Sequence, residues 1–215
     1  ARALLEMELC DAVVVGGSDS LCEFVLNGFA SLEVLSAEVS NPMSRNRNGI
    51  NLGEGACVFV MERSPDGIQL RGVGESCDAH HMSSPEPDGY GAQSAMQNAL
   101  KNAEMNPDKI QYLNLHGTGT RLNDEMEARA VLNTFPSVPF CSSTKPSFGH
   151  CLGAAGSIEA GICWMLLNSA TNSERQITLP PHYWDKKTDV NFPELDLVSP
   201  GQSISAESVV NLMSS

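Results

Sequence analysis

Two short apolar runs of this chain each lead into a glycine-rich turn that carries a histidine. IQYLNL at residues 110–115 precedes HGTGT at 116–120, and a run at about 138–142 precedes KPSFGH at 145–150. Runs of this length are typical of buried strands, and helical spacing of apolar residues follows each turn. Each histidine is therefore expected where a strand passes into a helix, at the sheet edge where open α/β folds bind ligands.

The alternation of strands and helices extends along the whole chain. We expect further strands at 11–17, 54–62 and 68–76, and helices at 20–35, 91–104, from about 123 with Asn123 or Asp124 as cap, and 153–168. The SPDG segment at 64–67 is the best candidate for a boundary between an earlier and a later part. This pattern predicts a layered α/β fold.

The charge and hydropathy of the chain exclude several classes of function. The formal net charge is −13 and the sequence pI is about 4.7, so most of the surface would repel nucleic acid and anionic membranes. The longest apolar runs, such as DAVVVGG at 11–17, are far shorter than the roughly 20 residues of a membrane span. With no secretory signal at the start, we expect a cytoplasmic protein that binds neither nucleic acid nor membrane.

The seven cysteines are scattered along the chain and odd in number. This arrangement favours reduced, buried thiols in a cytosolic protein over a disulfide framework. The one group with metal-like character is Cys77, His80 and His81 in CDAHHM, but no second ligand pair accompanies it at a suitable spacing. We therefore expect no metal site.

The second glycine-rich turn adds a lysine and a carboxylate to the two histidines. Lys145 and His150 share the turn, and Glu159 follows the histidine by nine residues, on the expected helix. One histidine at a strand end, or one glycine-threonine loop, has an ordinary structural explanation such as helix capping. Two such loops at strand ends, with a lysine and glycines near both histidines, indicate a functional site.

Both histidine segments closely resemble the two histidine motifs of the β-ketoacyl-acyl-carrier-protein synthases. These segments are HGTGT with Asp124 and Glu127, and KPSFGHCLGAAG; DAVVVGGSDS, the Gly28-Phe29 pair, RNGINLGEGACVFVME and DAHHMSSPEPDG have counterparts in the same order. Several ordered motifs are far more specific than one. The resemblance implies a thiolase-like layered αβαβα fold of two similar halves, with residues 1–63 ending the first half and 64–215 forming most of the second.

The resemblance also implies that part of the family's site lies outside this sequence. The nucleophilic cysteine of the family lies on a strand-to-helix turn that would fall shortly before Ala1, and the final glycine-rich loop would follow MSS at the other end. We therefore expect a central-to-C-terminal fragment that is inactive alone. The early cysteines occupy no such turn: Cys10, Cys22 and Cys57.

The chemistry of the family explains a need for two histidines. These enzymes load an acyl group onto the cysteine and then decarboxylate a malonyl-carrier, so enolate charge develops on the malonyl thioester oxygen. Neutral imidazoles that donate N–H groups to this oxygen stabilise the transition state, by roughly 3 kcal/mol per donor. The resemblance assigns this role to His116 and His150.

A lysine and three carboxylates are implied to complete the polar part of the site. An unpaired lysine charge in a buried site is costly, so Lys145 is expected to pair with a carboxylate. The resemblance favours Glu159 over Glu127 as that partner. Asp124 and Glu127, which accompany the HGTGT motif, are implied as further supporting residues of the site.

The substrate and partners are implied by the resemblance as well. Thr118 and Thr120 would offer hydroxyls to the amides of a phosphopantetheine arm, with helix and turn capping as an equal alternative. Phe29 matches a position that lines the acyl pocket. The expected partners are acyl carrier protein and a second ketosynthase-like subunit, in a homodimer or heterodimer. No cofactor is expected beyond the carrier's phosphopantetheine.

Three functions remain open at this point: an active ketosynthase, a non-catalytic partner of the chain-length-factor kind, and a thiolase-like enzyme that does not decarboxylate. Retention of His116, Lys145 and His150 favours the first, because a subunit without chemistry does not need polar groups in its interior. A thiolase would normally use a second cysteine as base where this chain has histidines. Residues 43–44 and Asn48 replace an aromatic-Asp pair and an Asp of the family, which leaves the substrate range open.

Overall fold

The structure is a computed structural model that describes residues 1–82, 84–171, 176–191, 193–205 and 212–214. Its α-helices are α1 (Arg2–Glu6), α2 (Glu23–Ser31), α3 (Tyr90–Asn102), α4 (Arg121–Thr134), α5 (Lys145–Phe148) and α6 (Ala155–Thr171). Its strands are β1 (Ala12–Asp19), β2 (Gly55–Glu62), β3 (Tyr112–Asn114), β4 (Phe140–Ser142), β5 (Gln176–Thr178), β6 (Ser203–Ser205) and β7 (Leu212–Ser214). Short 3-10 helices, η1 (Pro107–Lys109) and η2 (Leu152–Ala154), precede β3 and α6.

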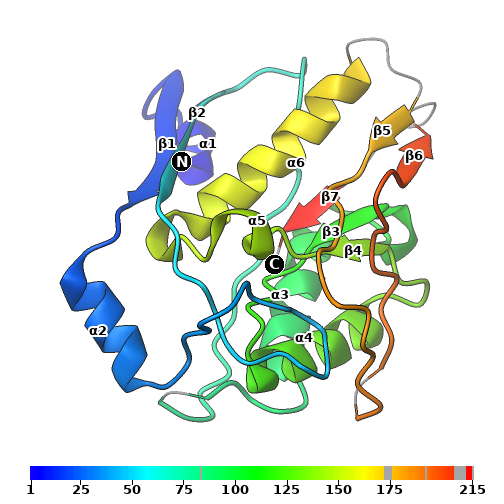
Figure 1. Cartoon of the computed structure of the whole chain (residues 1–215). Helices are drawn as coiled ribbons and strands as arrows, with labels where there is room; N and C mark the ends of the chain where they lie inside the picture. The colour runs from blue at the N-terminus through cyan, green and yellow to red at the C-terminus, as the bar shows by residue number, and fades with distance from the viewer. Residues whose placement is uncertain (83, 172–175, 192, 206–211, 215) are drawn as a thin grey trace.

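The elements form alternating layers of strands and helices (Figure 1). Helix α6 packs on β1 and β2 on one side and on β5 and β7 on the other. Strand β3 is the central strand of a parallel sheet with the order β4-β3-β7, and α3 and α4 lie on the side of this sheet away from α6. The resulting order of sheet, helix, sheet and helices is the layered α/β arrangement that the sequence predicted.

Two apolar clusters cover the two faces of β3 and explain why this short strand is completely buried. Leu113 and Leu115 pack with residues of α3 and α4, whereas Tyr112 packs with Cys163 of α6 and with Ile177 of β5. A strand buried on both faces has apolar residues in succession, as parallel strands between helices require. The central sheet is therefore the rigid base from which the histidine loops leave.

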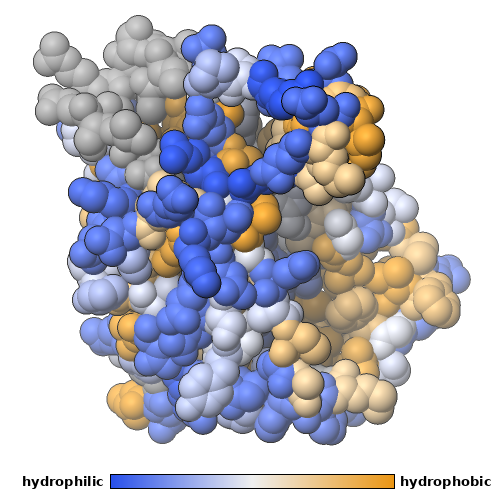
Figure 2. Space-filling model, turned by 180° about the vertical axis from the view of Figure 1, so that it is seen from behind, coloured by the Kyte–Doolittle hydropathy of each residue, from blue (hydrophilic) through white to orange (hydrophobic). Residues whose placement is uncertain are grey.

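The antiparallel pair β1 and β2 has a different environment. Its residues alternate in exposure, and Val14 pairs with Val60 on the outer face, where both side chains are 72% exposed. Apolar surface extends along this side of the molecule over β1, β2 and α2 (Figure 2). Within the described part of the chain, this outer face has no covering layer.

Most expected elements are confirmed, and the differences have local causes. The helix expected at 20–35 is shorter because Glu33 has a left-handed φ of 56° and Leu35 forms a bridge with Ile50. Helix α4 begins at Arg121 with Thr120 as its cap position, so the predicted cap at Asn123 or Asp124 is wrong. The Asp124 carboxylate is instead turned toward backbone N–H groups outside the helix.

The strand expected at 68–76 is also wrong, since these residues, all described, form no strand. The segment runs along α3, where a Cβ on Gly72 or Gly74 would lie within 2.3 Å of a helix carbonyl oxygen. Side-chain amides of α3 replace strand partners: Asn102 accepts the N–H of Val73, and Asn98 donates to the carbonyl of Glu75. The segment at 68–76 is thus held against α3 by its glycines and by hydrogen bonds, in place of a neighbouring strand.

The structure does not test the division at residues 64–67, which stays a prediction. Helix α6 from the later part packs directly on β1 and β2 from the earlier part. Among the described residues, no helix is long and apolar enough to cross a membrane.

Candidate active site

The two histidine loops leave the same edge of the central sheet. Strands β3 and β4 are parallel neighbours, so their carboxyl ends lie side by side. The loop after β3 carries His116, and the turn after β4 leads through α5 to His150. The two imidazole rings lie 5.1 Å apart between centroids, at 87° to each other. The predicted convergence of the two histidines is therefore confirmed.

Glu127 of α4 fixes the backbone on both sides of the first histidine. Its two carboxylate oxygens accept the N–H groups of His116 and Gly117, each at 2.7 Å. Gly117 has a φ of +39°, and a Cβ at this position would lie 2.5 Å from the Cβ of Ser143 in the second loop. The glycine thus permits the two loops to contact each other closely.

Asp124 supports the far side of the HGTGT loop. Its buried carboxylate accepts the N–H of Gly119 at 3.2 Å and the N–H of Met43 at 2.8 Å. Burial raises the pKa of Asp124 to about 6. Asp124 and Glu127 are one helical turn apart on α4, so this helix holds both ends of the loop.

The second loop contains a buried ion pair. The Nζ of Lys145 donates to Oε1 of Glu159, and each side chain is only 2% exposed. Lys145 begins α5 and Glu159 lies on α6, so the pair also joins two helices. This is the pairing that the resemblance favoured.

The surroundings keep both imidazoles neutral. Burial, and then the charge of Lys145, lower the pKa of His116 to about 4. Burial, Lys145 and the neighbouring His116 lower the pKa of His150 to about 3. At neutral pH each ring therefore carries one N–H and no charge.

The backbone of His150 is held by the segment before β2. Its N–H donates to the carbonyl of Asn51 at 2.7 Å, and its carbonyl accepts the N–H of Gly53 at 3.1 Å. The Nδ1 atom of His150 is buried and has no hydrogen-bond partner among the described residues. A buried ring nitrogen without a partner is available to a ligand, since leaving it unpaired costs free energy.

Of the three residues predicted to bind substrate, only the two threonines lie in a histidine loop. The hydroxyls of Thr118 and Thr120 lie 3.0 Å apart, and Thr120, at the cap position of α4, makes no capping bond with its side chain. Phe29 lies on α2, apart from the strand ends that carry the histidines (Figure 1), so the structure does not bring it to them. The roles of these three residues in substrate binding stay predictions.

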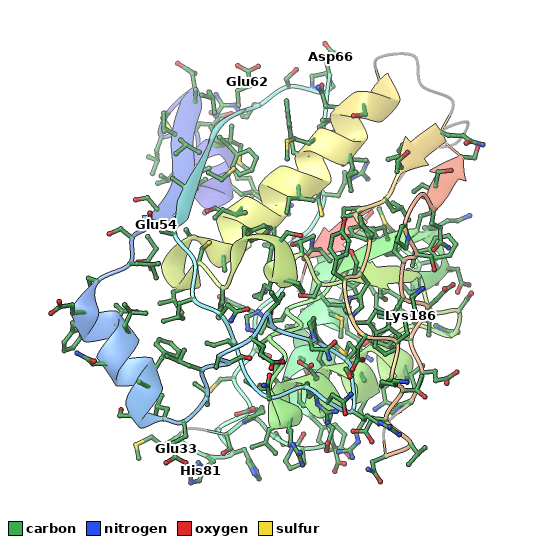
Figure 3. The ribbon with its side chains drawn as sticks, in the orientation of Figure 1. Glu33, Glu54, Glu62, Asp66, His81 and Lys186 are labelled. Carbon is green, nitrogen blue, oxygen red and sulfur yellow. The ribbon has the colours of Figure 1, made fainter. Side chains whose placement is uncertain are left out.

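The CDAHHM segment lies on the surface. Cys77, His80 and His81 are exposed, and His81 lies at the edge of the molecule (Figure 3). No group of three residues suited to metal binding occurs in the described ranges.

Two family models match consecutive parts of the chain. The N-terminal domain of β-ketoacyl synthase matches residues 1–67, and the C-terminal domain of β-ketoacyl synthase matches residues 68–174. This chain belongs to the β-ketoacyl synthase family.

Curated relatives and solved structures agree with this family. Nodulation protein E of Rhizobium leguminosarum bv. trifolii is 39% identical over 73% of this chain and 42% of its own length. The 3-oxoacyl-[acyl-carrier-protein] synthase 2 of Coxiella burnetii is 35% identical over 75% of this chain and 43% of its own length. The chain thus spans less than half the length of these relatives.

Solved ketosynthases share the thiolase-like layered fold of this chain. One is a ketosynthase (ApeO) in complex with its chain length factor (ApeC) from Xenorhabdus doucetiae, with a TM-score of 0.86, 44% identity, and coverage of 96% of this chain and 50% of that chain. Another is a β-ketoacyl synthase from Burkholderia phymatum, with a TM-score of 0.83, 27% identity, and coverage of 95% and 51%.

In the polar loop before β2, nothing in the sequence indicated the buried ion pairs of Arg47. Arg47 is buried and forms ion pairs at 2.7 Å with Glu125 of α4 and with Asp189. Met43 is 2% exposed and has a φ of 62°, so the loop turns sharply at the position where the family usually has an aromatic residue. Only contacts between distant segments reveal this loop as part of the site's support.

Proposed function

We propose that this chain supplies the two-histidine and lysine half of the active site of a β-ketoacyl-[acyl-carrier-protein] synthase. The reaction is the decarboxylative Claisen condensation of an acyl thioester with a malonyl-carrier in fatty-acid or polyketide synthesis, an acyltransferase reaction. One observation carries the proposal: two imidazoles that burial keeps neutral lie 5.1 Å apart between ring centroids, beside a buried lysine.

This geometry suits the stabilisation of one developing oxyanion. When the malonyl carboxylate leaves as carbon dioxide, the electron pair of the broken C–C bond moves into the thioester to form an enolate. N–H groups from His116 and His150 would donate to the enolate oxygen. Because both donors are held by the fold before the reaction, they need no reorganisation as the charge develops.

Lys145 contributes a fixed positive charge to the same site. Its pairing with Glu159 stabilises the ammonium form at a position with 2% exposure. The positive charge favours the neutral forms of both histidines, which lowers their pKa values further than burial alone. The enolate then attacks the acyl thioester on the enzyme's cysteine, and that thiolate leaves.

The proposed substrates arrive on acyl carrier protein in the cytoplasm. Thr118 and Thr120 are the proposed contacts of the phosphopantetheine arm, and no further cofactor is required. We also propose a two-fold assembly, as a homodimer or with a ketosynthase-like partner. The similarity to a ketosynthase solved with its chain length factor supports the heterodimer as one form.

A non-catalytic chain-length-factor role is the alternative. The buried Lys145–Glu159 pair argues against it, because isolated polar groups in an interior cost free energy that a subunit without chemistry can avoid. A cysteine at the nucleophile turn of the protein that contains this chain supports the catalytic role, and a glutamine there supports the alternative.

The test separates the two half-reactions in a protein of full family length. His116→Ala and His150→Ala should still accept an acyl group from its carrier, because acylation depends mainly on the thiolate. Carbon dioxide release from malonyl-carrier should fall roughly 100- to 1000-fold in each, the effect of losing one oxyanion donor. Acyl-enzyme is measured by intact mass, and carbon dioxide release by a coupled assay.

His80→Ala is the matched control, since this histidine is exposed on the CDAHHM loop. Equal losses in both assays would mean that the histidines serve the cysteine itself. Unchanged carbon dioxide release in both variants would remove them from the mechanism.

A further inference from the structure

A third buried histidine, His182, uses both of its ring nitrogens to join distant segments. Its side chain is 3% exposed and lies edge-on to Trp184, at 5.8 Å between ring centroids. Nδ1 is 3.0 Å from the backbone nitrogen of Ser143, and Nε2 is 3.0 Å from the carbonyl oxygen of Pro42. His182 thus connects the turn after β4 to the loop before β2.

These two contacts require a single neutral form of the ring. The backbone N–H of Ser143 can only donate, so Nδ1 must accept; the carbonyl of Pro42 can only accept, so Nε2 must carry the proton. Burial lowers the pKa of His182 to about 4, which agrees with the neutral ring.

Ser143 is the point where the two loops of the candidate site meet. Its hydroxyl donates to the carbonyl of Gly117 at 2.7 Å, directly after His116 in the first loop. The same hydroxyl accepts the N–H of Lys145 at 3.4 Å. A shift of Ser143 would therefore move both the first histidine loop and the lysine.

Pro42, the other end of the connection, lies in a firmly held segment. Neighbouring residues of its loop bind the stretch that follows His182: Ser44 donates to Asp185 at 2.7 Å, and the Arg45 N–H donates to the carbonyl of Lys187 at 2.9 Å. The adjacent Lys186 marks this stretch in Figure 3. These bonds hold the stretch that carries His182 to the loop without involving the imidazole, and Nδ1 of His182 then holds the backbone of Ser143.

We infer that His182 is a positioning residue for the candidate active site: through Ser143 it sets the placement of His116 and Lys145. The inference rests on the proposed function for its effect on rate, but its structural part stands on the contacts alone. His182 itself contacts neither histidine of the pair in any described hydrogen bond, so its influence passes through the Ser143 backbone and hydroxyl.

Three substitutions separate the two ends of the connection. His182→Asn places an amide oxygen near the position of Nδ1, so it keeps an acceptor for the Ser143 N–H and loses the bond to Pro42. His182→Gln places an amide nitrogen near the position of Nε2, so it keeps the Pro42 bond and loses the acceptor. His182→Phe keeps the ring volume beside Trp184 and loses both bonds.

The first measurement is the imidazole ¹⁵N spectrum of the chain, which contains only five histidines. Wild type at pH 7 should show His182 with a protonated Nε2 and an unprotonated Nδ1. The ring signals of His116 and His150 should stay near their wild-type positions in His182→Asn and shift in His182→Gln and His182→Phe. This measurement does not depend on any activity.

The second measurement is carbon dioxide release from malonyl-carrier by a protein of full family length. His182→Phe and His182→Gln should lower kcat about 10- to 100-fold, the size expected for a small misplacement of catalytic groups, with KM for malonyl-carrier unchanged. His182→Asn should retain most of the wild-type kcat. Thermal unfolding of all three variants shows whether lost stability alone explains the rates.

The two measurements distinguish the inference from the proposed function. A protonated Nδ1 in wild type, or equal shifts of the His116 and His150 signals in all three variants, would overturn the inference. So would equal rates in the Asn and Phe variants. Wild-type protein that releases no carbon dioxide, together with the predicted spectra, would overturn the proposed function and leave the positioning role in place.

Discussion

At the scale of single residues, Lys145–Glu159 is the one ion pair of the described residues in which both side chains are fully buried. Both side chains are 2% exposed, so neither charge is compensated by water. Removal of one partner from such a pair typically costs about 3 to 5 kcal/mol, because the other charge stays buried, whereas apolar replacement of both is often neutral. The pair is thus a requirement of the site and not a general source of stability.

Glu159→Gln should therefore lower the free energy of unfolding by about 3 kcal/mol, while Lys145→Met with Glu159→Leu should recover most of that loss. Urea unfolding measures both. The control is the exposed pair Arg2–Glu6, where Glu6→Gln should change stability by less than about 1 kcal/mol. A double variant less stable than Glu159→Gln would contradict this account of the pair.

At the scale of secondary-structure elements, the site depends on how closely two turns can approach. Gly117 is in a left-handed conformation, and a Cβ there would lie 2.5 Å from that of Ser143. The contact is made between backbone and a short side chain, so neither partner can move aside without shifting a strand end. The glycine is therefore required by the packing of the loops as well as by its own dihedral angles.

Gly117→Ala should destabilise the chain by about 1 to 3 kcal/mol, from the strain of a left-handed alanine together with the steric overlap. Gly28→Ala is the matched control: Gly28 lies within α2, and among the described residues no atom beyond its own helix backbone lies within 4 Å of an added Cβ. Helix propensity predicts that this change stabilises the chain by about 0.5 to 1 kcal/mol. Thermal unfolding measures the change in stability of both glycine variants. A change of the same sign in both would contradict the packing argument.

The elements also show which parts of the site the sequence could predict. Two apolar runs placed His116 and His150 at strand ends, and the resemblance to the condensing enzymes implied that the two histidines converge. The strand expected at 68–76 is wrong, because the sequence of this segment alone does not show that Gly72 and Gly74 pack against α3. The role of His182 could not be predicted, since its partners at 42 and 143 are defined only by the fold.

At the scale of the whole molecule, three buried histidines link the stability of the fold to pH. Burial is the first cause that lowers the pKa values of His116, His150 and His182, to about 4, 3 and 4. In the unfolded chain each histidine would have a pKa of about 6.5. As pH falls from about 6.5 toward 4, the unfolded chain binds protons that the folded chain does not, so stability present above this range is lost. Asp124 acts in the opposite sense, because its raised pKa of about 6 lets the folded chain bind one proton first.

The free energy of unfolding should therefore decrease as pH falls from 6.5 to 4.5, since three histidines outweigh one carboxylate. His182→Asn removes one of the groups that bind a proton on unfolding. Over most of this range, its free energy of unfolding should therefore fall less steeply than that of wild type, with a slope smaller by about 1.4 kcal/mol per pH unit. Urea unfolding at a series of pH values measures both slopes. Parallel curves for wild type and His182→Asn would show that the folded chain binds a proton at His182 as readily as the unfolded chain does, which its two hydrogen bonds do not allow.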